Sequence, residues 1–130
     1  MMKSIPVWKQ ELSDGVHAAR LASLYCCSPA ETASEAARYT AVLDGLEKTF
    51  GSHAEAGLYS APGRTEIGGN HTDHQHGRVL AGSVNIDMIA AAAPNDKNQL
   101  RVQSEGYDLC VIDLNDLEAR KEEENTTAAR

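Results

Sequence analysis

The sequence predicts an α+β fold in which two N-terminal helices precede a mixed, antiparallel-leaning sheet. Two observations support this prediction. Apolar residues recur three or four positions apart up to Phe50. After Gly51, β-branched and alternating segments are separated by turn residues. The 130 residues form a single predicted domain, and a hydrophobic content of 42% supports a modest core.

The first helix is predicted over residues 9–25, after an irregular lead-in over residues 1–8 that Trp8 anchors. Gly15 weakens this helix, because glycine has a low helix propensity. Its predicted apolar face consists of Leu12, Val16, Ala19 or Arg20, and Leu24.

The second helix has clearer boundaries. Ser28 and Glu31 have the spacing of a capping box, and Pro29 suits the first helical position. Gly51 is the expected C-cap. The predicted buried face consists of Tyr39, Val42 or Leu43, Leu46 and Phe50.

Strands are expected after Gly51. Gly82 is predicted to mark a bulge or a close backbone approach. A polar loop, Ala61–Gly77, should lie between the first two strands. The predicted strands are a short one at residues 58–59, a long one at 79–93, and two more at 100–104 and 107–114, with a turn at 95–98. Residues 115–130 are expected to form a polar tail, either a solvated helix end or a disordered segment.

The composition excludes some partners and compartments. A net charge of −7 and a pI near 5.1 argue against nucleic acid and anionic membrane surfaces, which select basic patches. No apolar run approaches the length of a transmembrane helix. An odd number of cysteines and the absence of a signal peptide predict reduced thiols and a cytoplasmic location.

The polar loop carries the residues with chemical potential. Gly68 and Gly69 permit positive φ and close approach to a ligand. His71 and Asp73 are two positions apart, so an extended segment would point both side chains the same way. Such a pair can hydrogen-bond two neighbouring hydroxyls of a sugar. Arg64 suits a phosphate, so the combination favours a sugar kinase.

Two other interpretations of the loop remain open. Four of its side chains could ligate a metal ion, although no cysteine lies nearby and the spacing is not that of a helical zinc motif. Those side chains are His71, Asp73, His74 and His76. Alternatively, His71 and Asp73 could satisfy the backbone amides of their own turn.

Three short segments in and beside the loop resemble a known signature. Ala61-Pro-Gly-Arg64, Gly69-Asn-His-Thr-Asp73 and Gly77-Arg-Val-Leu80 closely resemble the galactokinase signature of the GHMP small-molecule kinases. The resemblance extends over most of the chain, as far as Ser104-Glu-Gly-Tyr107. It implies the N-terminal part of the GHMP kinase fold. It also implies transfer of the ATP γ-phosphoryl group to the anomeric hydroxyl of galactose, with Mg²⁺ as the companion ion.

The resemblance also implies roles for individual residues. Arg64 would stabilise charge near the transferred phosphoryl group. His71 and Asp73 match the sugar-binding pair of the family, with Thr72 between them. Asn70 stands where the family usually has glutamate, and it can still accept a hydrogen bond from a hydroxyl.

Two features separate this chain from the family pattern. His74 and Asn70 replace the usual tyrosine and glutamate, which leaves the exact sugar open. The glycine- and serine-rich phosphate loop and the catalytic aspartate of the family do not occur among these residues.

The chain is therefore expected to be an incomplete, galactose-recognising N-terminal segment of a galactokinase. It should be inactive alone, with a missing C-terminal kinase portion as its partner and with uncovered apolar side chains in the strand at 79–93. The alternative from another class is a stand-alone galactose-binding or regulatory module.

Overall fold

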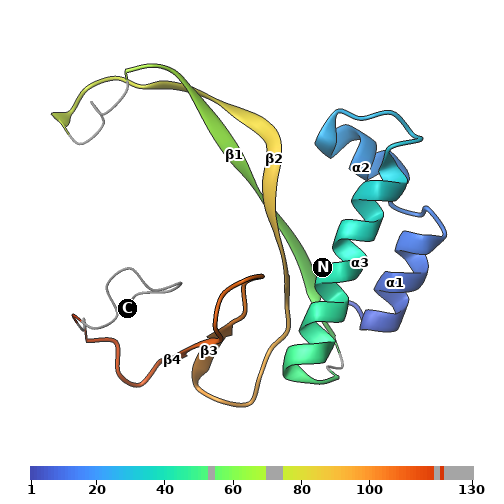
Figure 1. Ribbon diagram of the computed structural model, residues 1–130, viewed down its shortest axis with the longest axis vertical. Coiled ribbons are helices and arrows are strands. Elements are labelled where there is room, and N and C mark those ends of the chain that lie inside the picture. Colours follow the sequence, from blue (N-terminus) through green and yellow to red (C-terminus); the bar gives the residue numbers. More distant parts are fainter. Residues whose placement is uncertain (53–54, 70–74, 119–120, 122–130) are drawn as a thin grey trace. The chain divides into compact units, whose positions relative to one another are not determined.

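The computed structural model describes residues 1–52, 55–69, 75–118 and 121. They form two compact units, Met1–Ala93 and Pro94–Arg130. The predicted α+β class is confirmed, with three helices in the described residues where two were expected (Figure 1). The elements are α1 (Ile5–Ser13), α2 (Ala18–Tyr25), α3 (Thr32–Phe50), β1 (Gly57–Gly68), β2 (Leu80–Ala92), β3 (Gln99–Val102) and β4 (Cys110–Asp113).

The prediction of one helix over residues 9–25, after an irregular lead-in, is wrong. The chain is helical from Ile5, with Pro6 in the first turn, where its missing N–H costs nothing. The helix ends at Ser13, and Gly15 adopts a φ of +73° before α2 begins at Ala18. A left-handed glycine in this position separates the two helices because it reverses the local path of the chain.

This break also changes which side chains are buried. Val16 and Leu24, both predicted on the apolar face, are 63% and 50% exposed. Leu21 and Tyr25 are buried in their place, because α2 starts in a new register after Gly15. Trp8 is buried, as its predicted role as an anchor requires, and its Nε1–H donates to the Ala56 carbonyl at 2.8 Å.

Helix α3 begins at Thr32, three residues after the predicted start at Pro29. Half of the capping box is present, since the Glu31 carboxylate accepts hydrogen bonds from the backbone N–H and the hydroxyl of Ser28, at 2.8 and 2.7 Å. The helix ends as predicted at Gly51, which has a φ of +83° and whose N–H bonds the Glu47 carbonyl at 2.9 Å.

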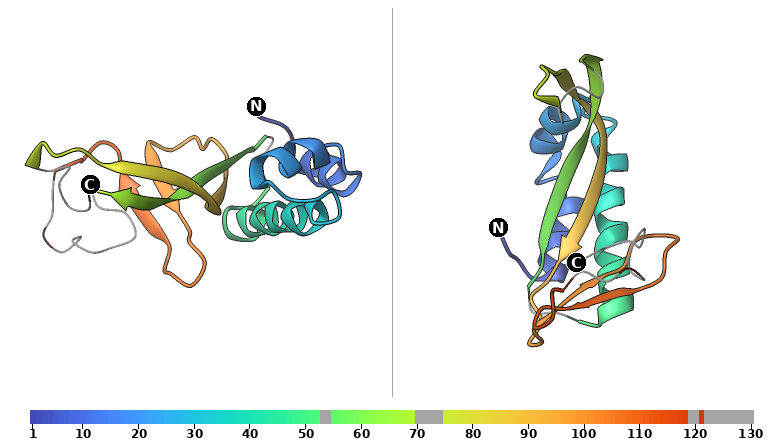
Figure 2. Two further views of the ribbon diagram at one scale, coloured as in Figure 1. Left: turned by 90° about the horizontal axis from the view of Figure 1, so that it is seen from above. Right: turned by 90° about the vertical axis from the view of Figure 1, so that its left-hand side faces the viewer.

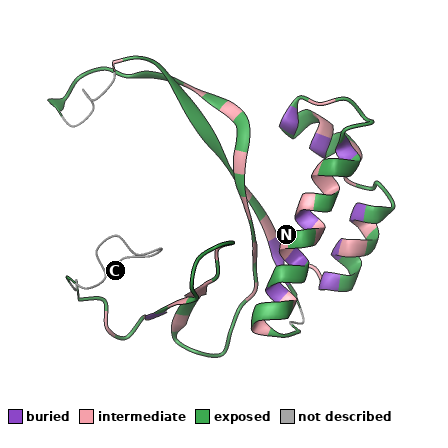
Figure 3. Ribbon diagram, in the orientation of Figure 1, coloured by how far each residue is buried: buried purple, intermediate pink, exposed green. Residues whose placement is uncertain are grey.

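The predicted buried face of α3 is confirmed. Tyr39, Leu43 and Leu46 are buried and Phe50 is half-buried. In the first unit, the buried residues gather in the helices and at the base of the β1–β2 hairpin (Figure 3). They form one cluster in the first unit, consisting of Ile5, Trp8, Leu12, Leu21, Tyr25, Tyr39, Leu43, Leu46 and Ala56.

Strands β1 and β2 form a long antiparallel hairpin, which appears as a twisted ribbon beside the helices (Figure 2). The predicted strand at 79–93 is confirmed as β2. The prediction that the polar loop starts at Ala61 is wrong, because β1 continues to Gly68. Pairing with β2 holds this stretch extended, even though it contains one proline and two glycines, which are depleted in strands.

The bulge predicted at Gly82 lies elsewhere. Gly82 pairs regularly with Thr65, whereas the register shifts around Gly63, between the pairs Pro62–Asp87 and Arg64–Ser83, and again between the pairs Glu66–Ala81 and Gly68–Leu80. A Cβ on Gly63 would lie 2.9 Å from the Ile86 carbonyl oxygen, so only glycine fits there.

The second unit contains an antiparallel hairpin of β3 and β4. Both predicted strands are present but shorter than expected. The predicted turn precedes β3, and in it the Asn95 side chain accepts the N–H of Lys97 at 2.9 Å. Ile112 is buried. Most of the predicted polar tail, residues 119–120 and 122–130, lies outside the described residues.

Candidate functional site

The distal end of the β1–β2 hairpin carries the segment for which the sequence predicts a site. Arg64 lies on β1 opposite Ser83, and its side chain is exposed. His76 is also exposed. The predicted sugar-binding residues Asn70, His71, Thr72 and Asp73 lie outside the described residues, together with His74.

The described backbone before this segment ends at a constrained glycine. Gly69 has a φ of +88°, as the sequence predicted, whereas Gly68 stays in β1. A Cβ on Gly69 would lie only 2.1 Å from the carbonyl oxygen of Arg78. The glycine is therefore required by a close approach between two segments of the chain's own backbone.

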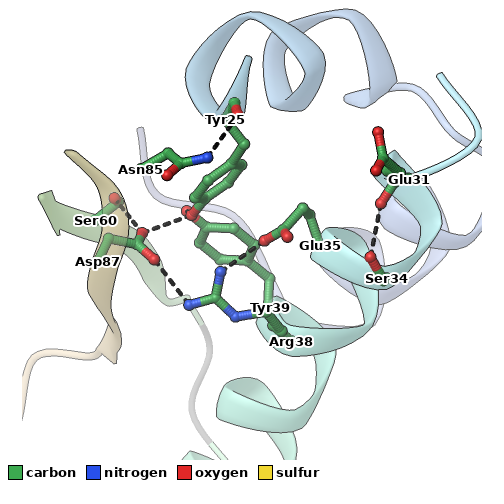
Figure 4. A network of polar contacts seen from close by, with 9 residues as sticks. All are labelled: Tyr25, Glu31, Ser34, Glu35, Arg38, Tyr39, Ser60, Asn85 and Asp87. Carbon is green, nitrogen blue, oxygen red and sulfur yellow. Dashed lines mark hydrogen bonds and ion pairs between the residues drawn. The ribbon is translucent and has the colours of Figure 1, made fainter. Parts of the chain in front are cut away.

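A buried polar network, which the sequence did not predict, lies nearer the helices (Figure 4). The side chain of Asp87 on β2 is only 3% exposed. Its carboxylate accepts hydrogen bonds from three side chains on three different elements. The donors are Ser60 Oγ on β1 at 2.5 Å, Tyr25 OH on α2 at 2.6 Å and an Arg38 guanidinium nitrogen on α3 at 2.7 Å.

Further contacts complete the network. The hydroxyls of Tyr25 and Tyr39 are 2.8 Å apart, and Glu35 forms a second ion pair with Arg38 at 2.6 Å. Asn85 Nδ2 donates to the backbone carbonyl of Tyr25 at 3.4 Å. A buried carboxylate is costly unless it is paired, and this one has three donors.

The electrostatics follow from this geometry. Burial opposes ionisation of Asp87, but the hydrogen bonds from Ser60, Tyr25 and Arg38 outweigh it and lower the pKa of Asp87. Burial and the neighbouring carboxylate raise the pKa of Tyr25, so the phenol remains a proton donor. The hydrogen bond to Asp87, followed by that to Glu35, raises the pKa of Arg38. The network thus contains the ion pair of Asp87 and Arg38, with the neutral hydroxyls of Ser60 and Tyr25 as further donors to Asp87 and with Glu35 as a second partner of Arg38.

One signal in the sequence could have revealed Asp87. Ile89 and Ala91 on β2, and Ala93 just after it, alternate along the chain and pack against the helical core. Asp87 occupies the same face, where an isolated carboxylate requires partners from other elements. The partners themselves are far away in the sequence, so spacing alone could not identify them.

Other features of the described residues add no second site. Two hollows lie beside α3 and are lined largely by small side chains, such as Ala33, Ala36 and Thr40. Arg64 does not line either hollow. Within the described ranges there is no group of three metal-ligating side chains. Since His71, Asp73 and His74 lie outside those ranges, the metal-binding alternative stays a prediction.

Comparison with known proteins bears directly on this hairpin. The family model described as the galactokinase galactose-binding signature matches residues 46–94. This segment contains the last turn of α3 and both strands of the hairpin. The resemblance to galactokinases predicted from the sequence is thereby confirmed for an N-terminal segment.

Curated galactokinases are also similar to part of this chain. The galactokinase of Ligilactobacillus salivarius is 35% identical over 83 residues, which is 62% of this chain and 21% of that protein. The galactokinase of Streptococcus suis is 32% identical over 84 residues, again 62% and 21%. The galactokinase of Lacticaseibacillus casei is 34% identical over 68 residues, which is 52% of this chain and 17% of that protein. The chain therefore spans about a fifth of the length of these relatives.

Two further findings concern the whole chain. No solved structure gives a significant match. Among the helices in the described part of the chain, none has the length and apolar character needed to cross a membrane.

Proposed function

We propose that this chain is the galactose-recognising N-terminal segment of a galactokinase. The complete enzyme would transfer the γ-phosphoryl group of ATP to the anomeric hydroxyl of galactose. The observation that supports this function is the match of residues 46–94 to the galactose-binding signature, which spans the whole β1–β2 hairpin. Galactokinases that are 32–35% identical over 62% of the chain add to the support.

In this proposal, the segment after Gly69 binds the sugar. The Asp73 carboxylate would accept hydrogen bonds from two neighbouring hydroxyls, and His71 would add one more. Asn70 and Thr72 would supply further polar contacts. The positive φ of Gly69 and its close approach to the Arg78 carbonyl support this arrangement, because they constrain the backbone just after the end of β1.

Arg64 has a separate proposed role. Arg64 is exposed on β1, five residues before Gly69. In this proposal, its guanidinium would therefore lie near the bound sugar. There it would stabilise negative charge on the transferred phosphoryl group. ATP and Mg²⁺ would be held by a further kinase portion, since a phosphoryl-transfer site requires a nucleotide cradle as well as a sugar site.

Calorimetric titration of the purified chain with galactose tests the sugar site. Glucose, which differs at one hydroxyl, serves as the ligand control. A double substitution, His71→Ala with Asp73→Ala, should weaken galactose binding by about 100-fold or more, because hydrogen bonds to a charged group are lost.

A matched control is His76→Asn, since His76 is an exposed histidine at a φ of +59° and asparagine tolerates that backbone conformation. This variant should bind galactose as the unaltered chain does. Equal affinity for glucose and galactose, or undiminished binding by the double variant, would contradict the proposed site.

A kinase assay tests the second part of the proposal. The chain alone should not turn over ATP in the presence of galactose and Mg²⁺. Sustained turnover that depends on both would contradict the need for a further kinase portion. If the chain binds galactose with the same affinity with and without the missing kinase portion, a stand-alone sugar-binding or regulatory module would be favoured instead.

A further inference from the structure

Asp87 lies where the β1–β2 hairpin leaves the helices. Its pair with Pro62 is the last one before the register shift at Gly63. On one side of this point, hairpin residues pack against the helical core; they are Leu58, Ile89, Ala91 and Ala93. On the other side, every residue of β1 from Ala61 to Gly68 is exposed. We call Ala61–Gly68 with Leu80–Ile86 the distal arm.

Packing of the distal arm on the helices does not set its direction, because its residues are mostly exposed (Figure 3). The irregular pairing at Gly63 also interrupts the ladder where the arm begins. The direction of the arm must therefore be set at its base.

The base of the arm is held by the network of Asp87. One carboxylate joins α2 through Tyr25, α3 through Arg38 and β1 through Ser60. Asn85, which lies two residues before Asp87 on β2, donates a hydrogen bond to the backbone carbonyl of Tyr25 on α2 (Figure 4). Four contacts from three elements fix both the position and the rotation of β2 at this point.

We infer that Asp87 is a positioning residue, whose bonds to Tyr25, Arg38 and Ser60 fix the direction of the distal arm and thereby place Arg64 and the turn at Gly69 for the substrate. The importance of this placement rests on the proposed function. The physical reason is that a buried carboxylate tolerates only arrangements that keep its donors, so alternative directions of the arm are penalised.

Distance measurements between spin labels test the inference without any ligand. In a background lacking the native cysteines, one label is placed at Lys48 on α3 and the other at Glu66 on the distal arm, both exposed positions. A second pair joins Lys48 to Ala90, an exposed position on the packed part of β2. Asp87→Asn should broaden the distance distribution of the first pair and leave that of the second pair narrow.

The matched control is Asp44→Asn, which removes an ion-paired carboxylate on α3 that bonds Lys9 rather than the hairpin. It should leave both distributions unchanged. If Asp87→Asn leaves the first pair narrow, or broadens both pairs equally, Asp87 has no positioning role beyond general stability. Should Asp87→Asn fail to fold, Tyr25→Phe removes one donor while keeping the ring, and the same two outcomes decide.

Galactose titration then links the arm to the substrate. Asp87→Asn should weaken galactose binding at least tenfold, while Asp44→Asn binds normally. If the unaltered chain does not bind galactose, the proposed function fails in this chain, and the spin-label result still decides whether Asp87 sets the direction of the arm. If galactose binds and Asp87→Asn retains full affinity, the link to the substrate is wrong.

Discussion

In both halves of the hairpin, β1 pairs with β2, but different interactions stabilise the two halves. The packed half places Leu58, Ile89, Ala91 and Ala93 against the helical core. The distal arm leaves Ile67, Leu80 and Ile86 exposed, by 67%, 62% and 77%. The first half is thus stabilised by burial and the second by backbone pairing and glycine geometry.

This difference separates stability from function along one hairpin. The uncovered apolar side chains expected in the strand at 79–93 are present in β2, and Met88 is 78% exposed. Arg64, which has a proposed role in phosphoryl transfer, lies in the exposed half, where its substitution should cost little stability. Residues that attach the hairpin to the helices lie in the packed half. Substituting them would impair function only by displacing the distal arm.

The largest expected effect is in the core that supports the packed half. Leu43 is fully buried, so Leu43→Ala should lower the free energy of unfolding by about 4 kcal/mol. Leu24→Ala is the control, because Leu24 is half exposed on α2 and its loss should cost far less. Urea denaturation measures both. Similar losses would show that the helical core does not carry the stability assigned to it.

The next effect concerns the junction between the halves. Asp87→Asn should lower the free energy of unfolding by about 3 kcal/mol at neutral pH, because Arg38 loses a buried anionic partner. The folded-state pKa of Asp87 is lowered, so its ionised form contributes stability above the ordinary carboxyl pKa of about 4. This contribution is lost as the pH falls through the folded-state pKa.

The stability gap between the unaltered chain and Asp87→Asn should therefore close on acidification below about pH 4. Urea titrations at several pH values measure it. Glu31→Gln is the control, since hydrogen bonds from Ser28 lower the pKa of Glu31 but its carboxylate is exposed, so the gap should be smaller. A gap for Asp87→Asn that is independent of pH would contradict the ion pair.

A smaller effect is expected in the distal arm. Gly69→Ala should cost more than about 1 kcal/mol, because alanine disfavours positive φ and its Cβ would meet the Arg78 carbonyl. Gly82→Ala, on the opposite strand, would meet only Ile67 Cδ1 at 4.0 Å and should be nearly neutral. Thermal unfolding distinguishes them, and equal melting temperatures would show that the turn is not as tight as described.

The smallest effect on stability is expected for Arg64. Its side chain is exposed, so Arg64→Ala should change the free energy of unfolding by less than about 0.5 kcal/mol. Under the proposed function, the same change should greatly reduce phosphoryl transfer in an assembled enzyme. A large loss of stability would place Arg64 among the structural residues of the hairpin.

Much of the fold could be predicted from local patterns. The buried face of α3 and its end at Gly51 follow from apolar spacing and from a glycine at the C-terminus. The positive φ of Gly69 agrees with the prediction made from the pair Gly68–Gly69. The division of the first helix at Gly15 was missed, because a single glycine is also tolerated inside helices.

The sequence by itself determined the α+β class, the apolar face of α3, the strand β2 and the signature of a galactose-binding segment, because each depends on residues that are close together in the chain. Only the tertiary structure decided that β1 extends to Gly68 and that Asp87 joins Tyr25, Arg38 and Ser60. Strand pairing and a buried charge both depend on partners far away in the sequence, and local spacing carries no information about them.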